Sequence, residues 1–320
     1  MQRRHPLLAQ AFALSKAGRN AEAVLLVNQV AAEGDPEAIF TLAEMKWRGG
    51  MVPQDPVQGR DLYRRAGELG HARAAATYTN LLANGVAGER NWPLALRRLA
   101  KEGRTDPRRR QALALLERME LTDDGDPVAV PDRQPLSDSP KAALVPRLFT
   151  ASECDYLLKL AEPGYAPSMV YDEQRRLVRD PIRTSDASTI HWQIEDPAVH
   201  ALNRRLAAVT GTKAEQGEAL QILRYRPGQQ YLSHFDFVQR SDNQRSQTAL
   251  VYLNDNYEGG ETCFVKADLK VKGKKGDALL FVNALPDGNV DPMSQHAGLP
   301  VERGAKLLAS RWIREHRWTP

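Results

Sequence analysis

The spacing of apolar residues along the chain changes from a helical to a strand-like period. Up to about residue 121, apolar side chains recur at the three- and four-residue intervals of amphipathic helices. A further helix is predicted after the capping-box residues Thr150 and Glu153, and another from Asp196–Pro197 to Gly211. Beyond these helices the period becomes two, which predicts short strands between glycine-rich turns. The predicted strands are 219–225, 231–238, 248–255, 261–266, 278–284 and 306–314.

The helical part contains an internal repeat of 36 residues, a period typical of helical solenoids. Its copies are related by the pairs Gly34/Gly70, Ala38/Ala74, Gly49/Gly85 and Gly67/Gly103. The first copy, with Leu62-Tyr63 near its centre, looks like a Sel1-type repeat, a relative of the tetratricopeptide repeat. A divergent copy follows from 74 to 103, and a partial one is expected from about 7 to 34. Such a region either stabilises the chain as a helical cap or offers a concave surface to a peptide or partner.

A boundary between two domains is predicted after the repeats. The last helix begins at the Asp106–Pro107 cap and is expected to reach Leu121, and residues 122–140 then contain four prolines, typical of a semi-extended linker. The predicted organisation is a helical repeat domain at 1–121, a linker at 122–140 and a second domain at 141–320. Helices followed by about six short strands favour a jelly-roll, or double-stranded β-helix, for the second domain. The fold class is therefore α+β with two domains.

Three residues in the second domain form a candidate metal site. His234 and Asp236 lie two positions apart in a predicted strand, so their side chains point the same way. Together with the distant His296 they supply two imidazoles and one carboxylate, which can bind one face of an Fe(II) ion and leave positions open. Lys306 follows ten residues after His296, where its ammonium could hold a carboxylate of an organic co-substrate. A His-x-Asp pair alone is common by chance, so the surrounding sequence has to decide.

That surrounding sequence resembles the catalytic domain of the prolyl 4-hydroxylases, from about residue 141 to 320. The resemblance lies in the order and spacing of the segments 221–236, 248–254, 258–262, 275–281 and 296–306. It implies that His234, Asp236 and His296 bind Fe(II), and that Lys306, Tyr225 and Thr248 hold 2-oxoglutarate. It further implies that the substrate contacts Tyr231, Trp312, Arg245 and Glu218. Arg183-Thr-Ser185 also resembles a family segment, without an assigned role, and Asn283 departs from the serine or bulkier residue common in relatives.

The expected activity is hydroxylation of prolyl residues in a protein or peptide. The enzyme would bind Fe(II) and consume O₂ and 2-oxoglutarate, which would be converted to succinate. Ascorbate would serve as reductant. The repeat domain would recruit the substrate or a partner. Two alternatives stay open: the same chemistry on a free amino acid, small metabolite or other side chain, and a non-catalytic interaction protein built on the repeats. The intact set of iron ligands with Lys306 argues against the second alternative.

The composition of the chain limits the kinds of partner and the location that are expected. The 320 residues include 44 Lys and Arg against 40 Asp and Glu, a formal charge of +4, so no nucleic acid is expected as partner. No apolar run is long enough for a transmembrane helix, and no signal peptide is expected at the basic start of the chain. The two cysteines, Cys154 and Cys263, form neither a disulfide framework nor a zinc pattern, and a cytoplasmic location is expected.

Overall fold

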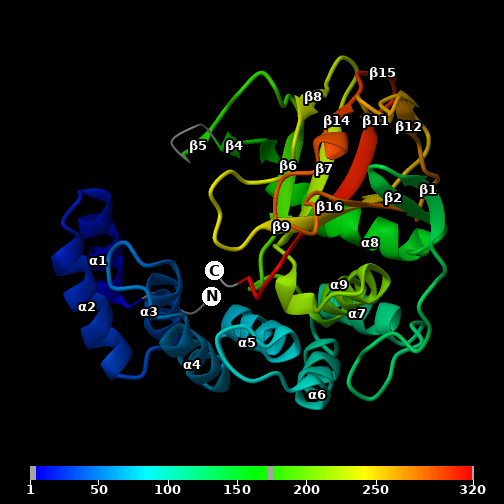
Figure 1. Cartoon of the computed structure of the whole chain (residues 1–320). Helices are drawn as coiled ribbons and strands as arrows, with labels where there is room; N and C mark the ends of the chain where they lie inside the picture. Colours follow the sequence, from blue (N-terminus) through cyan, green and yellow to red (C-terminus); the bar gives the residue numbers. More distant parts are fainter. Residues whose placement is uncertain (1–4, 172–175, 319–320) are drawn as a thin grey trace. The chain divides into compact units, whose positions relative to one another are not determined.

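The computed structural model of the chain describes residues 5–171 and 176–318 and divides into two compact units. Unit 1 consists of residues 1–117 together with the segment 192–198. Unit 2 consists of residues 118–191 and 199–320. The sequence colouring in Figure 1 separates the blue and cyan helices of unit 1 from the green, yellow and red strands of unit 2.

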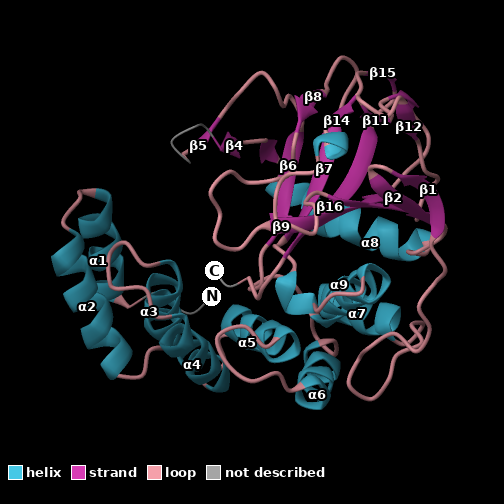
Figure 2. Ribbon diagram, viewed as in Figure 1, coloured by secondary structure: helices cyan, strands magenta, loops and turns pink. Residues whose placement is uncertain are grey.

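Unit 1 is an array of helices in which each helix packs against the next (Figure 2). The helices are α1 Pro6–Lys16, α2 Asn20–Ala32, α3 Pro36–Arg48, α4 Pro56–Glu68, α5 Ala72–Asn84, α6 Trp92–Glu102 and α7 Pro107–Leu116. They form successive pairs, as the 36-residue period predicted.

Local sequence sets where most of these helices begin. The side chains of Asp35, Asp55, Asn91 and Asp106 each accept a hydrogen bond from a backbone N–H in the first turn of the following helix. A proline occupies the first or second position of each of these helices, where the missing N–H would have no intrahelical partner anyway. The expected N-cap at Asp106 is thus confirmed, although helix α7 ends at Leu116 rather than Leu121.

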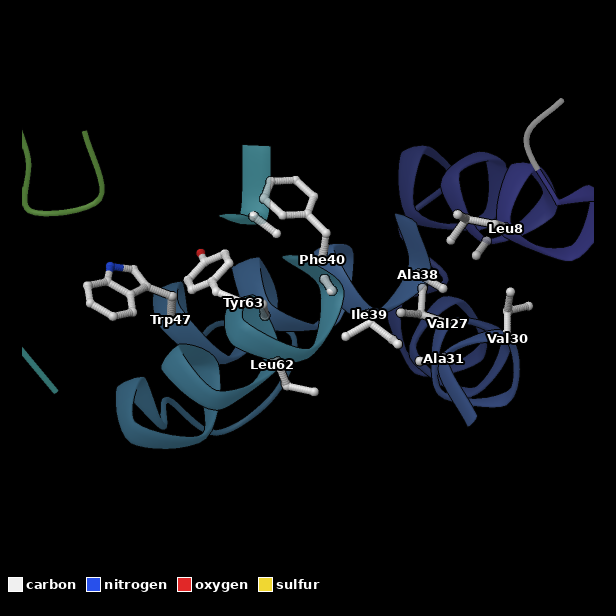
Figure 3. Close-up of a cluster of buried hydrophobic side chains, with 14 of the residues drawn as sticks. Leu8, Val27, Val30, Ala31, Ala38, Ile39, Phe40, Trp47, Leu62 and Tyr63 are labelled. Carbon is white, nitrogen blue, oxygen red and sulfur yellow. The ribbon is translucent and has the colours of Figure 1, made fainter. Parts of the chain in front are cut away.

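Glycine lets α4 and α5 approach closely at their crossing. A Cβ atom added to Gly67 would lie 2.8 Å from the Cα atom of Ala75, so no larger residue fits without moving the backbone. The equivalent Gly103 lies against Arg110 of α7. The interior between α1 and α5 is apolar, and Figure 3 shows Leu8, Val27, Ile39 and Tyr63 among its buried side chains. Burial of this cluster stabilises the array, because no single pair of helices encloses its own apolar face.

Unit 2 contains a large and a small antiparallel sheet (Figure 1). The large sheet has the strand order β1-β2-β13-β9-β16-β7-β6-β3, the small sheet β12-β11-β14-β8, and β10 pairs with β15 and β4 with β5. The strands are β1 Gln134–Asp138, β2 Lys141–Val145, β3 Ala166–Pro167, β4 Val170–Tyr171, β5 Leu177–Val178, β6 Asp186–Ile190, β7 Leu220–Tyr225, β8 Tyr231–His234, β9 Arg245–Tyr252, β10 Glu258–Gly259, β11 Thr262–Phe264, β12 Leu269–Val271, β13 Ala278–Val282, β14 His296–Gly298, β15 Val301–Arg303 and β16 Lys306–Arg314.

Apolar side chains from both sheets form one core, which includes Phe264 of the small sheet and Phe281 and Leu223 of the large one. Helix α8 (Ala151–Ala161) packs against β6 and β7, and its predicted capping box between Thr150 and Glu153 is present. Glu153 also binds Arg205 of helix α9 (Pro197–Thr210) through an ion pair of 2.8 Å. Two sheets with helices packed on the larger one make the expected jelly-roll.

Two of the differences between unit 2 and the sequence-based prediction concern the expected linker and the metal site. Residues 134–138 of the expected linker form the edge strand β1, which pairs with β2 with a register shift between Pro135 and Ser137. An edge strand tolerates Pro135, since one side of it needs no ladder partner. The strand expected over 231–238 ends at His234, so Asp236 lies in a bend after the strand. Among the described residues no helix is long and apolar enough to cross a membrane.

Candidate active site

Three potential metal ligands converge at one end of the small sheet. His234 ends β8 and His296 begins β14, and the antiparallel register places these two residues opposite each other. Asp236 lies in the bend after β8, with its carboxylate 3.6 Å from Nε2 of His234 and 3.7 Å from Nε2 of His296. One ligand atom from each residue lies within 4.8 Å of the others. Strand pairing thus brings together His234 and His296, which are 62 positions apart in the chain.

Backbone carbonyls fix the orientation of both imidazoles. Nδ1 of His234 lies 2.8 Å from the carbonyl oxygen of Leu232, and Nδ1 of His296 lies 2.9 Å from that of Ser294. A carbonyl oxygen can only accept, so each Nδ1 carries the proton and each Nε2 keeps its lone pair. Both lone pairs face the carboxylate of Asp236. An imidazole with its proton on Nδ1 and its lone pair on Nε2 is the tautomer that can bind a metal ion through Nε2.

The site's protonation state also suits a cation. Burial, followed by the neighbouring His234, lowers the pKa of His296 to about 4, so its ring is neutral at neutral pH. Burial alone would raise the pKa of Asp236, but the adjacent imidazoles and the Arg245 guanidinium outweigh burial and lower it. The two imidazole nitrogens and the carboxylate form a donor set that fits Fe(II). The residues present therefore fit the metal that the sequence predicts.

Lys306 supplies a buried cation from strand β16 of the large sheet. It begins β16, is 2% exposed, and donates to the carbonyl oxygen of Gly260 at 2.6 Å. Within the described part of the chain its ammonium forms no ion pair, and burial lowers its pKa to about 7. An ammonium withdrawn from water without a carboxylate partner is unfavourable, so a bound carboxylate would restore the missing charge.

A cavity that is partly open to solvent connects the metal ligands with Lys306. Tyr225 lines it beside Lys306, its partner in the β7–β16 register. Tyr231 and Trp312 also line it, as the resemblance implied. The ring of Tyr231 stacks on the ring of His234 with centroids 3.5 Å apart, and it is therefore part of the wall next to the metal ligands.

Three residues predicted to contact ligands lie elsewhere. Thr248 is fully buried and is not among the residues that line the cavity, and its hydroxyl donates to Asp236 at 2.7 Å. Glu218 and Arg245 do not line the cavity either, since they form a bidentate ion pair with each other at 2.6 and 2.9 Å. The Arg245 guanidinium lies 3.9 Å from the ring centroid of Trp312. In the structure Thr248 is thus bonded to Asp236, and Glu218 and Arg245 to each other, and their contacts with a ligand stay predictions.

The sequence left other lining residues unassigned. Leu308 and Ser310 lie in β16 between Lys306 and Trp312, at alternate positions. The period of two along this strand could have revealed them. Arg183 and Thr262 come from segments far away in the chain, and only tertiary structure brings them to the cavity. Cavity-lining residues also include Leu223, Leu250 and Gly298.

Several known proteins are similar to parts of this chain. Residues 220–314 match the 2OG-Fe(II) oxygenase superfamily. The chain is 34% identical over 207 residues to the probable prolyl 4-hydroxylase 10 of Arabidopsis thaliana, covering 57% of this chain and 72% of the relative. It is 29% identical to the solved viral collagen prolyl hydroxylase from Paramecium Bursaria Chlorella virus-1, covering 56% of this chain and 98% of that one with a TM-score of 0.43. A Sel1 repeat protein from Oxalobacter formigenes is 18% identical, covering 34% of this chain and 85% of that one with a TM-score of 0.32.

Proposed function

Because the chain belongs to the prolyl 4-hydroxylase family of 2-oxoglutarate- and Fe(II)-dependent oxygenases, we propose that it hydroxylates prolyl residues in a protein or peptide. Hydroxylation would be coupled to decarboxylation of 2-oxoglutarate to succinate. The observation that carries the proposal is that one cavity joins two imidazoles, one carboxylate and a buried ammonium. The lowered pKa of His296 keeps its ring neutral and able to bind a metal ion, and the lowered pKa of Asp236 keeps its carboxylate charged.

Three residues would bind the metal, and a fourth would bind the co-substrate. His234, Asp236 and His296 would hold Fe(II), which supplies the activation of O₂ when bound. Lys306 would pair with the carboxylate of 2-oxoglutarate that lies away from the metal. A buried ammonium acts as a point charge, and the low dielectric around it strengthens the attraction. The side chains of Leu308, Tyr225 and their neighbours line the cavity and would shield part of the co-substrate from water.

The cavity also suits a peptide that presents a flat, apolar ring. Tyr231 and Trp312 provide aromatic walls on which a pyrrolidine ring can pack. Two buried donors, Nε of Arg183 and Nε1 of Trp312, have no hydrogen-bond partner within the described part of the chain. A peptide carbonyl would satisfy such donors, whereas an isolated hydrocarbon would leave them unpaired.

Unit 1 completes the proposal as a recruitment surface for the substrate or a partner. Helical arrays of this kind present a continuous side-chain surface with little internal rearrangement. Ascorbate as a reductant and a cytoplasmic location are also part of the proposal. The two cysteines, which are free in the structure, suit a reducing compartment.

The test is release of succinate from 2-oxoglutarate by the purified full chain with Fe(II) and ascorbate. It should be run with a panel of proline-containing peptides and with free proline, beside the variant His234→Ala. We expect turnover to rise with a peptide, to add the mass of one oxygen atom to proline, and to vanish in the variant.

Other outcomes separate the alternatives. Turnover that depends on His234 but ignores every peptide would keep the oxygenase and reject prolyl peptides as substrate. Oxidation of free proline alone would favour a small-molecule substrate. Absence of turnover, together with no metal-dependent binding of 2-oxoglutarate, would reject the enzymatic proposal.

A further inference from the structure

Four side chains of the repeat helices meet one turn of the chain's own later sequence. The turn, Trp192–Ile194, belongs to the same compact unit as the repeat helices. It follows the end of helix α5 by more than a hundred positions in the chain. The four side chains are Glu44 of α3, Tyr63 of α4, and Asn80 and Asn84 of α5.

The two asparagines bind the backbone of this turn. Asn80 donates from Nδ2 to the carbonyl oxygen of Gln193 at 2.8 Å, and Asn84 donates to that of Trp192 at 3.0 Å. They are four residues apart in α5 and so lie on one face of the helix. Their oxygens already accept from unit 1, that of Asn80 from Arg109 and that of Asn84 from the N–H of Val86. The helices therefore fix both amides with their NH₂ groups directed at the turn.

The side chain of Gln193 is recognised separately. Its Nε2 lies 2.6 Å from the hydroxyl of Tyr63 and 3.1 Å from Oε1 of Glu44. The hydroxyl of Tyr63 donates to Glu44, and burial raises the pKa of this tyrosine, so the group stays protonated. The neighbouring Trp192 packs against the apolar cluster of the repeats. A turn with an aromatic residue followed by glutamine thus meets an apolar surface, two amide donors and a carboxylate.

We propose that this surface recognises a Trp–Gln turn, and that its resident ligand is the chain's own Trp192–Gln193. A partner with the same features binds there only by displacing the resident turn. The inference rests on the recruitment role proposed for unit 1 and adds that this recruitment is competitive. Tethering gives the resident turn an effective concentration on the order of millimolar, so an outside ligand competes poorly until the resident contacts are weakened.

The experiment uses the full chain and a fluorescent cyclic peptide that copies residues 189–197, closed so that the turn is preformed. Binding is measured by fluorescence anisotropy for the unmodified chain and for the double variant W192A/Q193A, which vacates the side-chain contacts. We expect the double variant to bind the peptide at least tenfold more tightly. Ile194→Ala is the matched control, because Ile194 is 48% exposed, and it should bind as weakly as the unmodified chain.

Asn84→Asp, added to the double variant, tests the surface itself. Aspartate keeps the oxygen that accepts from Val86 but loses the donor to the ligand, so peptide affinity should fall at least tenfold. Equal affinity of the unmodified chain and the double variant would overturn the inference. So would a double variant that melts like the unmodified chain and binds no peptide. Succinate release by the same samples reports the proposed function separately, since it requires no peptide at this surface.

Discussion

The hydroxyl of Thr248 donates to Oδ2 of Asp236 at 2.7 Å, in a fully buried position behind the candidate metal ligands. The amide of Asn283 in turn donates to the same hydroxyl at 2.9 Å. The hydroxyl hydrogen of Thr248 therefore points to the carboxylate, and the hydroxyl oxygen accepts the hydrogen bond from the amide. This chain of two hydrogen bonds fixes the rotamer of Asp236 before any metal binds.

Removing the Thr248 hydroxyl should weaken metal binding. In Thr248→Val the shape is kept, but the carboxylate of Asp236 loses a donor and is free to rotate. Loss of such a supporting contact typically costs about 10–100-fold in metal affinity. The measurement is anaerobic titration with Fe(II) or Co(II), with Thr248→Ser as the control that retains the hydroxyl and should remain near the unmodified affinity. Unchanged affinity in Thr248→Val would show that Asp236 is positioned by other contacts.

Binding of 2-oxoglutarate should take up a proton at Lys306. Burial lowers the pKa of Lys306 to about 7 in the free protein, whereas pairing with a carboxylate favours the charged form. Above pH 7 the charged fraction falls about tenfold per pH unit, so the apparent affinity should fall in proportion. Calorimetry at pH 8 in two buffers of different ionisation enthalpy measures the uptake.

The control for this linkage is Lys306→Arg, whose guanidinium stays charged in the whole range. It should bind 2-oxoglutarate without proton uptake, even if more weakly. The same lowered pKa has a consequence for the ligand-free fold. Between pH 7 and the usual lysine pKa of 10.5 the unfolded chain binds more protons than the folded one, so stability should rise with pH in this window. A flat affinity profile in the unmodified chain would contradict the role of Lys306.

Breaking the largely buried ion pair between Arg245 and Glu218 should destabilise unit 2. Among the described residues, Arg245→Ala leaves Glu218 paired with Arg314, and it removes the guanidinium from the Trp312 ring. Breaking a buried pair typically costs about 3–5 kcal/mol, and the remaining Arg314 contact should keep the cost at the lower end. The free energy of unfolding from urea denaturation measures it. Arg303→Ala, which breaks the exposed pair with Glu258, should cost less than about 1 kcal/mol.

Metal binding should stabilise the chain against heat. A ligand present at about 100 times its dissociation constant adds about 2.7 kcal/mol, provided that it binds the folded state alone. We therefore expect Co(II), which replaces Fe(II) without oxidation in air, to raise Tm in the unmodified chain. His296→Ala should abolish this rise while its metal-free Tm stays close to that of the unmodified chain. An equal Tm rise in His296→Ala would place the metal elsewhere.

The sequence by itself determined the local elements and the identity of the chemistry. Asp35, Asp55, Asn91 and Asp106 begin helices because an acceptor side chain and a proline act within one turn of the chain. The period of two in β16 aligned Lys306 with Trp312, since strand geometry alone directs alternate side chains to one face. The metal ligands and Lys306 were also evident, because their residue types and spacing are constrained by chemistry.

Only the tertiary structure decided which residues each side chain contacts. Thr248, Glu218 and Arg245 have residue types that suit ligand binding, but packing of β9 and β16 places them against Asp236 and one another. Arg183 reaches the cavity, and Gln193 reaches the repeat helices, through contacts between segments far apart in the chain. Such pairings depend on how sheets and helices pack in three dimensions, and no local pattern encodes them.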